Sequence, residues 1–232
     1  MATLLAVMLQ VSPASAGALE RAILGKSAIV DLSHSEGERQ GSLPNGSVGK
    51  DFGTRLNALG IVRKDKRTIA QIPLRELLAP AVVVNLTAKV AEAPEYRATV
   101  EDLLAWERQY GRIPKQSAVL LYTGWARRWA DAARYANLDA QGVTRAPGFS
   151  AAALAFLVNE RQVQGVGLDA FTPDASSVGG GDAPAPIVPP GAWLIENLAN
   201  LDRLPIKGAK LIVAPLRLEA ASASARVIAI LP

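Results

Sequence analysis

One short stretch of the chain combines residue types that can do chemistry. Residues 50–62 read KDFGTRLNALGIV and set an aspartate, an arginine and an asparagine around Gly53 and Thr54. Glycine adopts backbone conformations that are closed to other residues, so a Gly-Thr pair can turn the chain and aim its neighbours into a cleft. The stretch is therefore a candidate for the remnant of a reactive site, for a site of different chemistry, or for an ordinary turn.

The elements that must position this stretch alternate between strands and helices. Apolar runs predict strands at 27–32, 81–86, 118–122, 163–168, 210–213 and 226–231, and helices are expected at 18–25, 99–110 and 150–158. Residues 68–78 favour a strand edge and a short helix, whereas 33–50 and the Gly/Pro-rich 178–190 are predicted loops. This alternation predicts an α/β fold, or a mixed β fold with peripheral helices.

Composition excludes several kinds of site and partner. The chain has no cysteine and one histidine, His34, so disulfides, thiolate metal sites and multi-histidine metal sites are excluded. Its net charge is only +4, and apart from the charged run at 63–67 the basic residues are scattered. With four Phe and four Tyr and no nucleic-acid-binding signature, we expect no nucleic-acid partner. No apolar run reaches about 18 residues, so we expect no membrane span.

The N-terminus resembles a secretory signal peptide. Residues 3–11 are apolar and are followed by Ala14-Ser15-Ala16, which fits a signal-peptidase cleavage pattern, although no basic residue precedes the apolar run. We therefore expect export, with residues 1–16 removed and residues 17–232 forming a single domain. The alternatives are an N-terminal docking helix or a misplaced start codon, and either would leave a cytoplasmic protein.

Several further segments form a joint pattern: VDLSH at 30–34, VLLYTGWARRW at 119–129, GVGLDAFTPD at 165–174 and WLIENLANLDRLP at 193–205. Together they resemble the cyclase family of metal-dependent hydrolases, which includes kynurenine formamidases of tryptophan catabolism and isatin-hydrolase-like enzymes. The resemblance runs from about residue 20 to the end of the chain. It implies a mixed β barrel-like core with flanking helices, of the swivelling β/β/α type, and assembly into homodimers or tetramers.

The family motif H-x-G-T-H-x-D-x-P-x-H-F aligns with residues 51–62. The resemblance implies that Asp51 and Arg55 stand where the family has two metal-binding histidines. Asn57 replaces a metal-binding aspartate, and Ile61 occupies the position of the catalytic histidine. Isoleucine cannot transfer a proton, and general acid–base help is typically worth about 10²- to 10⁴-fold in rate.

Downstream, Glu196 preserves the family's glutamate ligand, and Asp182 lies close to the position of its partner histidine. The divalent metal that the family implies, zinc or manganese, activates water by lowering its pKa from about 15.7 toward about 7, which usually needs about three strong ligands. A guanidinium at Arg55, about 4 Å from a dication, would instead repel it by several kcal/mol. An ion pair of Arg55 with Asp51 or Glu196 would fill the metal position.

Three functions follow from these residues. By resemblance the chain is an arylformamidase-like hydrolase that cleaves the C–N bond of an aryl formamide or cyclic amide, and its substituted site predicts weak or absent activity. Alternatively, it binds a small aromatic amide or carboxylate without catalysis, or serves as a non-catalytic subunit of an oligomer. The candidate pocket residues are Arg55, Thr54, Trp125, His34 and Asp169. For three of them a structural role is the alternative: hydrogen bonding for His34, core packing for Trp125 and turn capping for Asp169.

Overall fold

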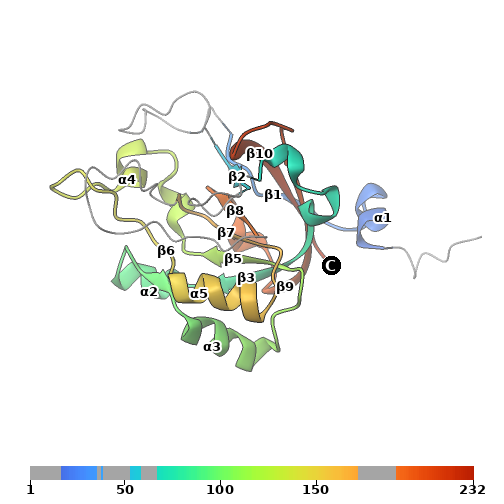
Figure 1. Ribbon diagram of the computed structural model, residues 1–232, viewed down its shortest axis with the longest axis horizontal. Coiled ribbons are helices and arrows are strands. Elements are labelled where there is room, and N and C mark those ends of the chain that lie inside the picture. Colours follow the sequence, from blue (N-terminus) through green and yellow to red (C-terminus); the bar gives the residue numbers. More distant parts are fainter. Residues whose placement is uncertain (1–16, 36–37, 39–52, 59–66, 172–191) are drawn as a thin grey trace, which may run out of the picture.

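The computed structural model describes residues 17–35, 38, 53–58, 67–171 and 192–232 (Figure 1). The helices are α1 Ala18–Ile23, α2 Thr87–Glu92, α3 Val100–Tyr110, α4 Ala132–Ala136 and α5 Ala151–Ala155, which continues as a π-helical turn over Phe156–Glu160. The strands are β1 Ile29–Asp31, β2 Arg55–Asn57, β3 Leu78–Asn85, β4 Arg97–Ala98, β5 Ala118–Tyr122, β6 Gly148–Phe149, β7 Gly165–Leu168, β8 Trp193–Glu196, β9 Lys207–Pro215 and β10 Ser222–Ile230. None of the helices in these ranges has the length and apolar character needed to cross a bilayer.

The large sheet closes on itself as a barrel. Its strands follow the order β10-β2-β8-β7-β5-β3-β9, and β9 pairs back onto β10. The contacts among β3, β5, β7 and β8 are parallel, the remaining ones are antiparallel, and β1 adds to the other edge of β10. The predicted mixed β barrel-like core with flanking helices is therefore confirmed.

Two apolar layers hold the barrel together. Side chains alternate along each strand, so one set fills the barrel and the other covers its outside. Leu56, Val83 and Ile195 belong to the inner cluster, whereas Val82 and Leu194 belong to the cluster that packs beneath α3 and α5 (Figure 1). The residues on either side of Leu56 and Ile195, including Arg55 and Glu196, consequently face outward.

Inside the barrel, a tryptophan side chain of β8 packs directly on a glycine of β7. The indole of Trp193 lies against Gly165, where an added Cβ would come within 2.2 Å of the Cδ2 and Cε3 atoms of the ring. The indole nitrogen of Trp193 donates to the carbonyl of Glu76 at 2.9 Å, which fixes the ring in place. Position 165 therefore has to be glycine because a side chain there would occupy the space of the indole.

Most of the predicted elements are present. The helix expected at 99–110 begins after Thr99, which forms a reciprocal capping box with Asp102. Residues 69–71 and 74–77 form 3₁₀ turns, where a strand edge and a short helix were expected. The loops predicted at 178–190 and over most of 33–50, the charged residues 63–66 and the signal-like segment 1–16 lie outside the described residues.

Candidate functional site

Strand β2 carries the described part of the family motif and lies between β8 and β10. In its register Arg55 is opposite Glu196 of β8, and Asn57 is opposite Ser222 of β10. Directly opposed residues in a sheet project from the same face. Arg55, Asn57, Glu196 and Ser222 thus form one polar group on the outside of the barrel, which we call the outer-face cluster.

The outer-face cluster is joined by hydrogen bonds between its members. Asn57 donates from Nδ2 to Oε2 of Glu196 at 2.9 Å, and Arg55 donates from Nη2 to Oγ of Ser222 at 2.9 Å. Asn57 and Glu196 are buried, and Arg55 is half-buried. Because an ionised carboxylate only accepts hydrogen bonds, the amide of Asn57 must present its NH₂ group to Glu196. Of the candidates named from the sequence, Arg55, Asn57 and Glu196 lie in this cluster, whereas Ser222 and its bond to Arg55 were not foreseen.

The described residues of the cluster do not fit a divalent metal. A hydrolytic site usually needs about three protein ligands. Among the residues that the structure describes, no group of three His, Cys, Asp or Glu side chains converges to hold an ion. Glu196 is the one carboxylate of the cluster, and Asn57 directs an N–H toward it. The predicted ligands Asp51 and Asp182, and Ile61 at the catalytic position, lie outside the described residues.

The Gly-Thr pair forms a buried junction. Gly53 has φ of +78°, a conformation that favours glycine, and its carbonyl accepts from the side chain of Asn197 at 2.8 Å. The hydroxyl of Thr54 donates to the carbonyl of Asn197 at 2.6 Å and accepts from the backbone N–H of His34 at 3.0 Å. In the described structure, then, the pair acts as a turn that ties three distant segments together.

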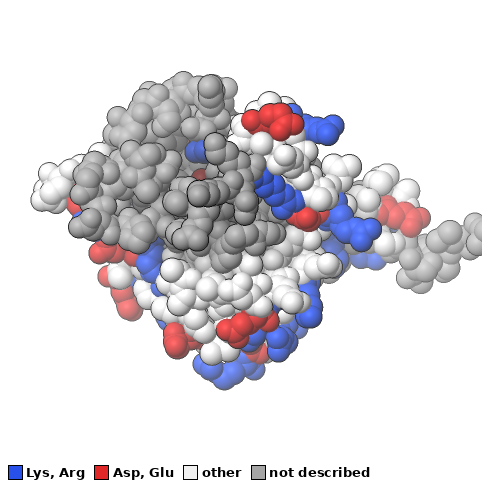
Figure 2. All heavy atoms as spheres, in the orientation of Figure 1, with Lys and Arg blue, Asp and Glu red and all other residues white. Residues whose placement is uncertain are grey.

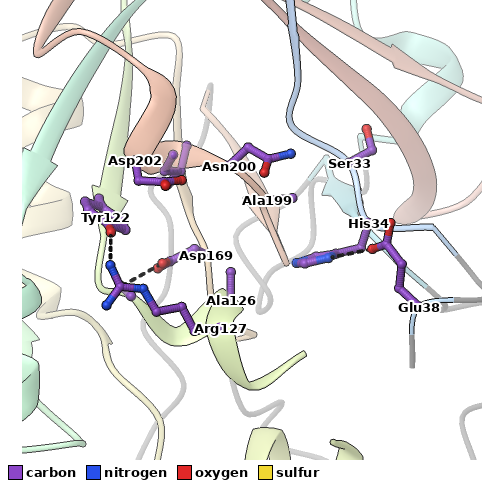
Figure 3. Close-up of a pocket in the computed structure, with 12 residues that line it drawn as sticks. Ser33, His34, Glu38, Tyr122, Ala126, Arg127, Asp169, Ala199, Asn200 and Asp202 are labelled. Atoms are coloured by element: carbon purple, nitrogen blue, oxygen red, sulfur yellow. Dashed lines mark hydrogen bonds and ion pairs between the residues drawn. The ribbon is translucent and has the colours of Figure 1, made fainter. Parts of the chain in front are cut away.

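The ring of His34 lies in an aromatic row. It stacks on Trp129 with 4.0 Å between ring centroids and 12° between planes, and Trp129 meets Tyr135 edge-on at 5.0 Å. Nδ1 of His34 lies 3.3 Å from Oε2 of Glu38 (Figure 3). These contacts are compatible with the hydrogen-bonding role that is the alternative for His34. They do not indicate a catalytic role.

A polar cavity of about 400 Å³ opens at the ends of β5 and β7. Its described wall includes His34, Glu38, Tyr122, Arg127, Asp169 and Asp202, with the small Ala126 and Ala199 between the two polar sides (Figure 3). The structure thus places two predicted pocket residues, His34 and Asp169, on one cavity. Arg127, whose guanidinium donates to the Tyr122 hydroxyl at 2.8 Å, and Asp202 were not among the predicted pocket residues.

Trp125 lies in the protein core and is not part of the cavity wall described above. It is 1% exposed, its Nε1 donates to the carbonyl of Tyr135 at 3.0 Å, and the guanidinium of Arg128 lies 3.9 Å from its ring centroid. These are the contacts of a core residue. The pocket role of Trp125 stays a prediction, as do those of Arg55, Thr54 and Asp169.

Asp169 is a buried carboxyl at the wall of this cavity. Burial raises its pKa to about 6, although hydrogen bonds from Thr123 and from the backbone N–H of Gly124 oppose the shift. The folded protein therefore holds a proton on Asp169 at pH values where the unfolded chain, with a pKa of about 3.9, has lost it. The contribution of this proton to stability is fully present below about pH 3.9 and is lost as the pH rises through 6.

We expect this group alone to lower the free energy of unfolding by about 1 kcal/mol between pH 5 and pH 7. Urea unfolding of the native protein and of Asp169→Asn at pH 5, 6 and 7 measures it. The variant keeps His34, Glu38 and Asp202, so the difference between the two pH slopes isolates Asp169. Parallel slopes would show that Asp169 does not titrate in this range.

The comparisons with known proteins agree with this fold. The family model described as "Putative cyclase" matches residues 28–175, more than half of the chain. The isatin hydrolase of Roseibium aggregatum is 32% identical over 166 residues, which span 69% of this chain and 62% of that protein. The matched stretch is therefore less than two thirds of the curated relative.

Solved structures of cyclase-family proteins have the same fold as this chain. Isatin hydrolase A from Ralstonia solanacearum superposes with a TM-score of 0.78 at 26% identity, over 91% of this chain and 95% of that one. A structure described as a potential metal-dependent hydrolase with cyclase activity has a TM-score of 0.59 at 19% identity, over 88% and 98% of the two chains, and shows the shared fold alone. This chain belongs to the cyclase family and is similar to isatin hydrolases.

Proposed function

We propose that this chain is a cyclase-family protein that binds a small aromatic carboxylate or amide and has lost metal-dependent amide hydrolysis. The observation that carries the proposal is the hydrogen bond from Asn57 to Glu196, made directly opposite Arg55. In the family pattern these three positions hold metal ligands. Here an amide N–H of Asn57 bonds the remaining carboxylate, and Arg55 lies opposite that carboxylate's residue in the strand register.

The exchange of residues reverses the charge preference of the cluster. A dication approaching Glu196 also approaches the fixed charge of Arg55, and at about 4 Å this repulsion reaches several kcal/mol at an effective dielectric of about 20. An anionic ligand is instead attracted to Arg55, because a half-buried guanidinium can donate two parallel hydrogen bonds to one carboxylate. The cluster therefore favours a carboxylate over a metal ion.

The type of ligand follows from the family's chemistry. Hydrolysis of a cyclic amide fused to an aromatic ring opens that ring and leaves a carboxylate on the aromatic product, whereas hydrolysis of an aryl formamide releases formate and an aryl amine. A family member that keeps the barrel and gains Arg55 can retain affinity for such an aromatic carboxylate without forming it. A purely subunit-like role has no specific observation in its favour.

Loss of metal-dependent hydrolysis is tested by metal loading and activity in parallel. We expect the native chain, incubated with Zn²⁺ or Mn²⁺ and desalted, to retain well under one ion per chain. It should also show no hydrolysis of isatin or N-formylkynurenine above the uncatalysed rate. Isatin hydrolase A from Ralstonia solanacearum, treated identically, is the positive control. One bound ion per chain together with turnover would contradict the proposal.

Ligand binding is tested by thermal shift with a panel of aromatic carboxylates. At about 100 times its dissociation constant a ligand adds about 2.7 kcal/mol of stability, which for a chain of this size raises Tm by several degrees. Arg55→Gln is expected to abolish the shift, and Arg127→Gln, on the separate polar cavity, is expected to preserve it. Absence of any shift across the panel would contradict a binding role.

A further inference from the structure

The small sheet beside the barrel carries an arginine that packs on a glycine. Strands β4 and β6 pair in parallel, with Arg97 opposite Gly148, and β4 leads into α3 while β6 leads into α5 (Figure 1). A Cβ added at Gly148 would lie 2.2 Å from Nη1 of Arg97 and 3.4 Å from its Cζ. The guanidinium therefore occupies the space that a side chain at position 148 would fill.

Within the part of the chain that the structure describes, this guanidinium has no acceptor. Nη1 of Arg97 is buried without a hydrogen-bond partner, and the side chain takes part in no hydrogen bond or ion pair there. Burial lowers the pKa of Arg97, and the charge of Glu95 opposes this shift. The carboxylate of Glu95, however, is engaged by Nη1 of Arg145 at 3.1 Å. A buried charge without a counterion is strongly unfavourable, so Arg97 calls for an anion.

Other arginines with buried or partly buried side chains show what Arg97 lacks. Arg161 bonds both carboxylate oxygens of Glu107 at 2.7 and 2.9 Å, and Arg67 meets Glu76 at 2.6 Å. In both cases the fold supplies a carboxylate where it removes a guanidinium from water. Because no described residue does so for Arg97, an acceptor from solution is the simplest completion of this group.

We propose that Arg97 anchors a binding site for a small oxyanion, such as phosphate, beside the β4–β6 sheet. A guanidinium presents its N–H groups in a planar fork that matches two oxygens of such an anion. Arg97 is only partly buried as a whole, so an ion can reach it from solvent, while the burial of Nη1 favours a small ion over an aromatic acid. The site lies on a different sheet from the outer-face cluster and goes beyond the function proposed above.

The surrounding surface does not attract anions in general. Over α2 and α3 acidic and basic side chains are interspersed, and no broad basic patch covers this part of the face that Figure 2 shows. Attraction must therefore come from the Arg97 guanidinium itself. For this reason we expect phosphate to act at concentrations where chloride of equal ionic strength has no effect.

The first experiment compares the native chain with Arg97→Met in thermal unfolding at pH 7, with and without phosphate. Phosphate at about 100 times its dissociation constant should raise the Tm of the native chain by several degrees, and sodium chloride at matched ionic strength should not. Arg97→Met should lose this response. Without phosphate its Tm should match or exceed the native value, because an apolar side chain replaces a buried charge without a counterion.

The second experiment measures phosphate affinity by calorimetry and moves the guanidinium without removing its charge. In Gly148→Ala the new methyl group would displace Nη1, which is the end of a flexible side chain, so the fold should persist while phosphate binds at least about tenfold more weakly. Arg108→Met, at an exposed arginine of α3, changes the net charge as Arg97→Met does and should leave the affinity unchanged.

Three results would overturn the proposal. The first is a native chain that phosphate does not stabilise beyond chloride. The second is a lower Tm of Arg97→Met than of the native chain without phosphate, because the chain itself would then supply the acceptor. The third is a phosphate response that Arg97→Met keeps and Arg55→Gln loses, which would place the anion at the outer-face cluster and leave the proposed function intact.

Discussion

Replacing Gly165 with alanine is expected to destabilise the protein by about 3 kcal/mol, near the upper end for one methyl group forced into a packed core. The new Cβ would lie 2.2 Å from two atoms of the Trp193 indole and 2.4 Å from Cζ3. The indole cannot move aside easily, because its nitrogen is bonded to the carbonyl of Glu76. Urea unfolding of the variant, or its yield of folded protein if it is too unstable, measures the effect.

Two further variants separate a steric cause from a general effect of glycine replacement. Gly167→Ala brings the new Cβ to 2.9 Å from Cδ2 of Leu120 and 3.0 Å from Cδ1 of Leu198, which are the ends of flexible side chains, so a smaller loss of about 1 kcal/mol is expected. Combining Gly165→Ala with Trp193→Leu should cost less than the sum of the two single changes. Additive losses would show that contact with the indole is not the cause.

Replacing Arg161 with methionine is expected to cost about 3 kcal/mol at neutral pH, the lower end for removing one partner of a buried ion pair. Nε and Nη2 of Arg161 bond the two carboxylate oxygens of Glu107 at 2.7 and 2.9 Å, and the side chains are only 10% and 12% exposed. Without the guanidinium Glu107 keeps the backbone N–H of Ile113 but remains a buried charge without its counterion.

The pH dependence of this loss has a defined sign. Hydrogen bonding to Arg161 lowers the pKa of Glu107, so its contribution is present above the unfolded pKa of about 4.3 and is lost as the pH falls through the lower folded value. The difference between native and variant should therefore be largest above about pH 5 and shrink toward pH 3. Glu107→Gln completes a double-mutant cycle. A difference that is independent of pH would contradict the ion-pair explanation.

The sequence predicted the long apolar elements well because their character comes from local pattern. Residues 118–122 form β5 with the predicted bounds, and the helix at 99–110 shows its cap in the sequence as Thr99 followed by Asp102. Strands β2 and β8, which read RLN and WLIE, were not predicted as strands. Their pairing with distant strands, which no local pattern contains, makes them strands.

The same limit applies to the site. Comparison with the family pattern identified Asn57 and Glu196 as candidates, but their hydrogen bond depends on the register between β2 and β8, 139 residues apart in sequence. Thr54 was marked as a pocket residue because it follows Gly53, and its contacts with His34 and Asn197 became visible only in three dimensions. Arg127 was not predicted as a pocket residue because the cavity wall is assembled from separate segments of the chain.

The closure of the barrel through β2 has an evolutionary consequence. The ladder that β2 forms with β8 and β10 uses main-chain groups, which every amino acid except proline supplies equally. Substitutions at Arg55 and Asn57 can thus accumulate by drift without opening the barrel. Under the function proposed above, the barrel has outlasted the catalytic site, so relationship inferred from the fold alone does not separate active hydrolases from family members that have lost the activity.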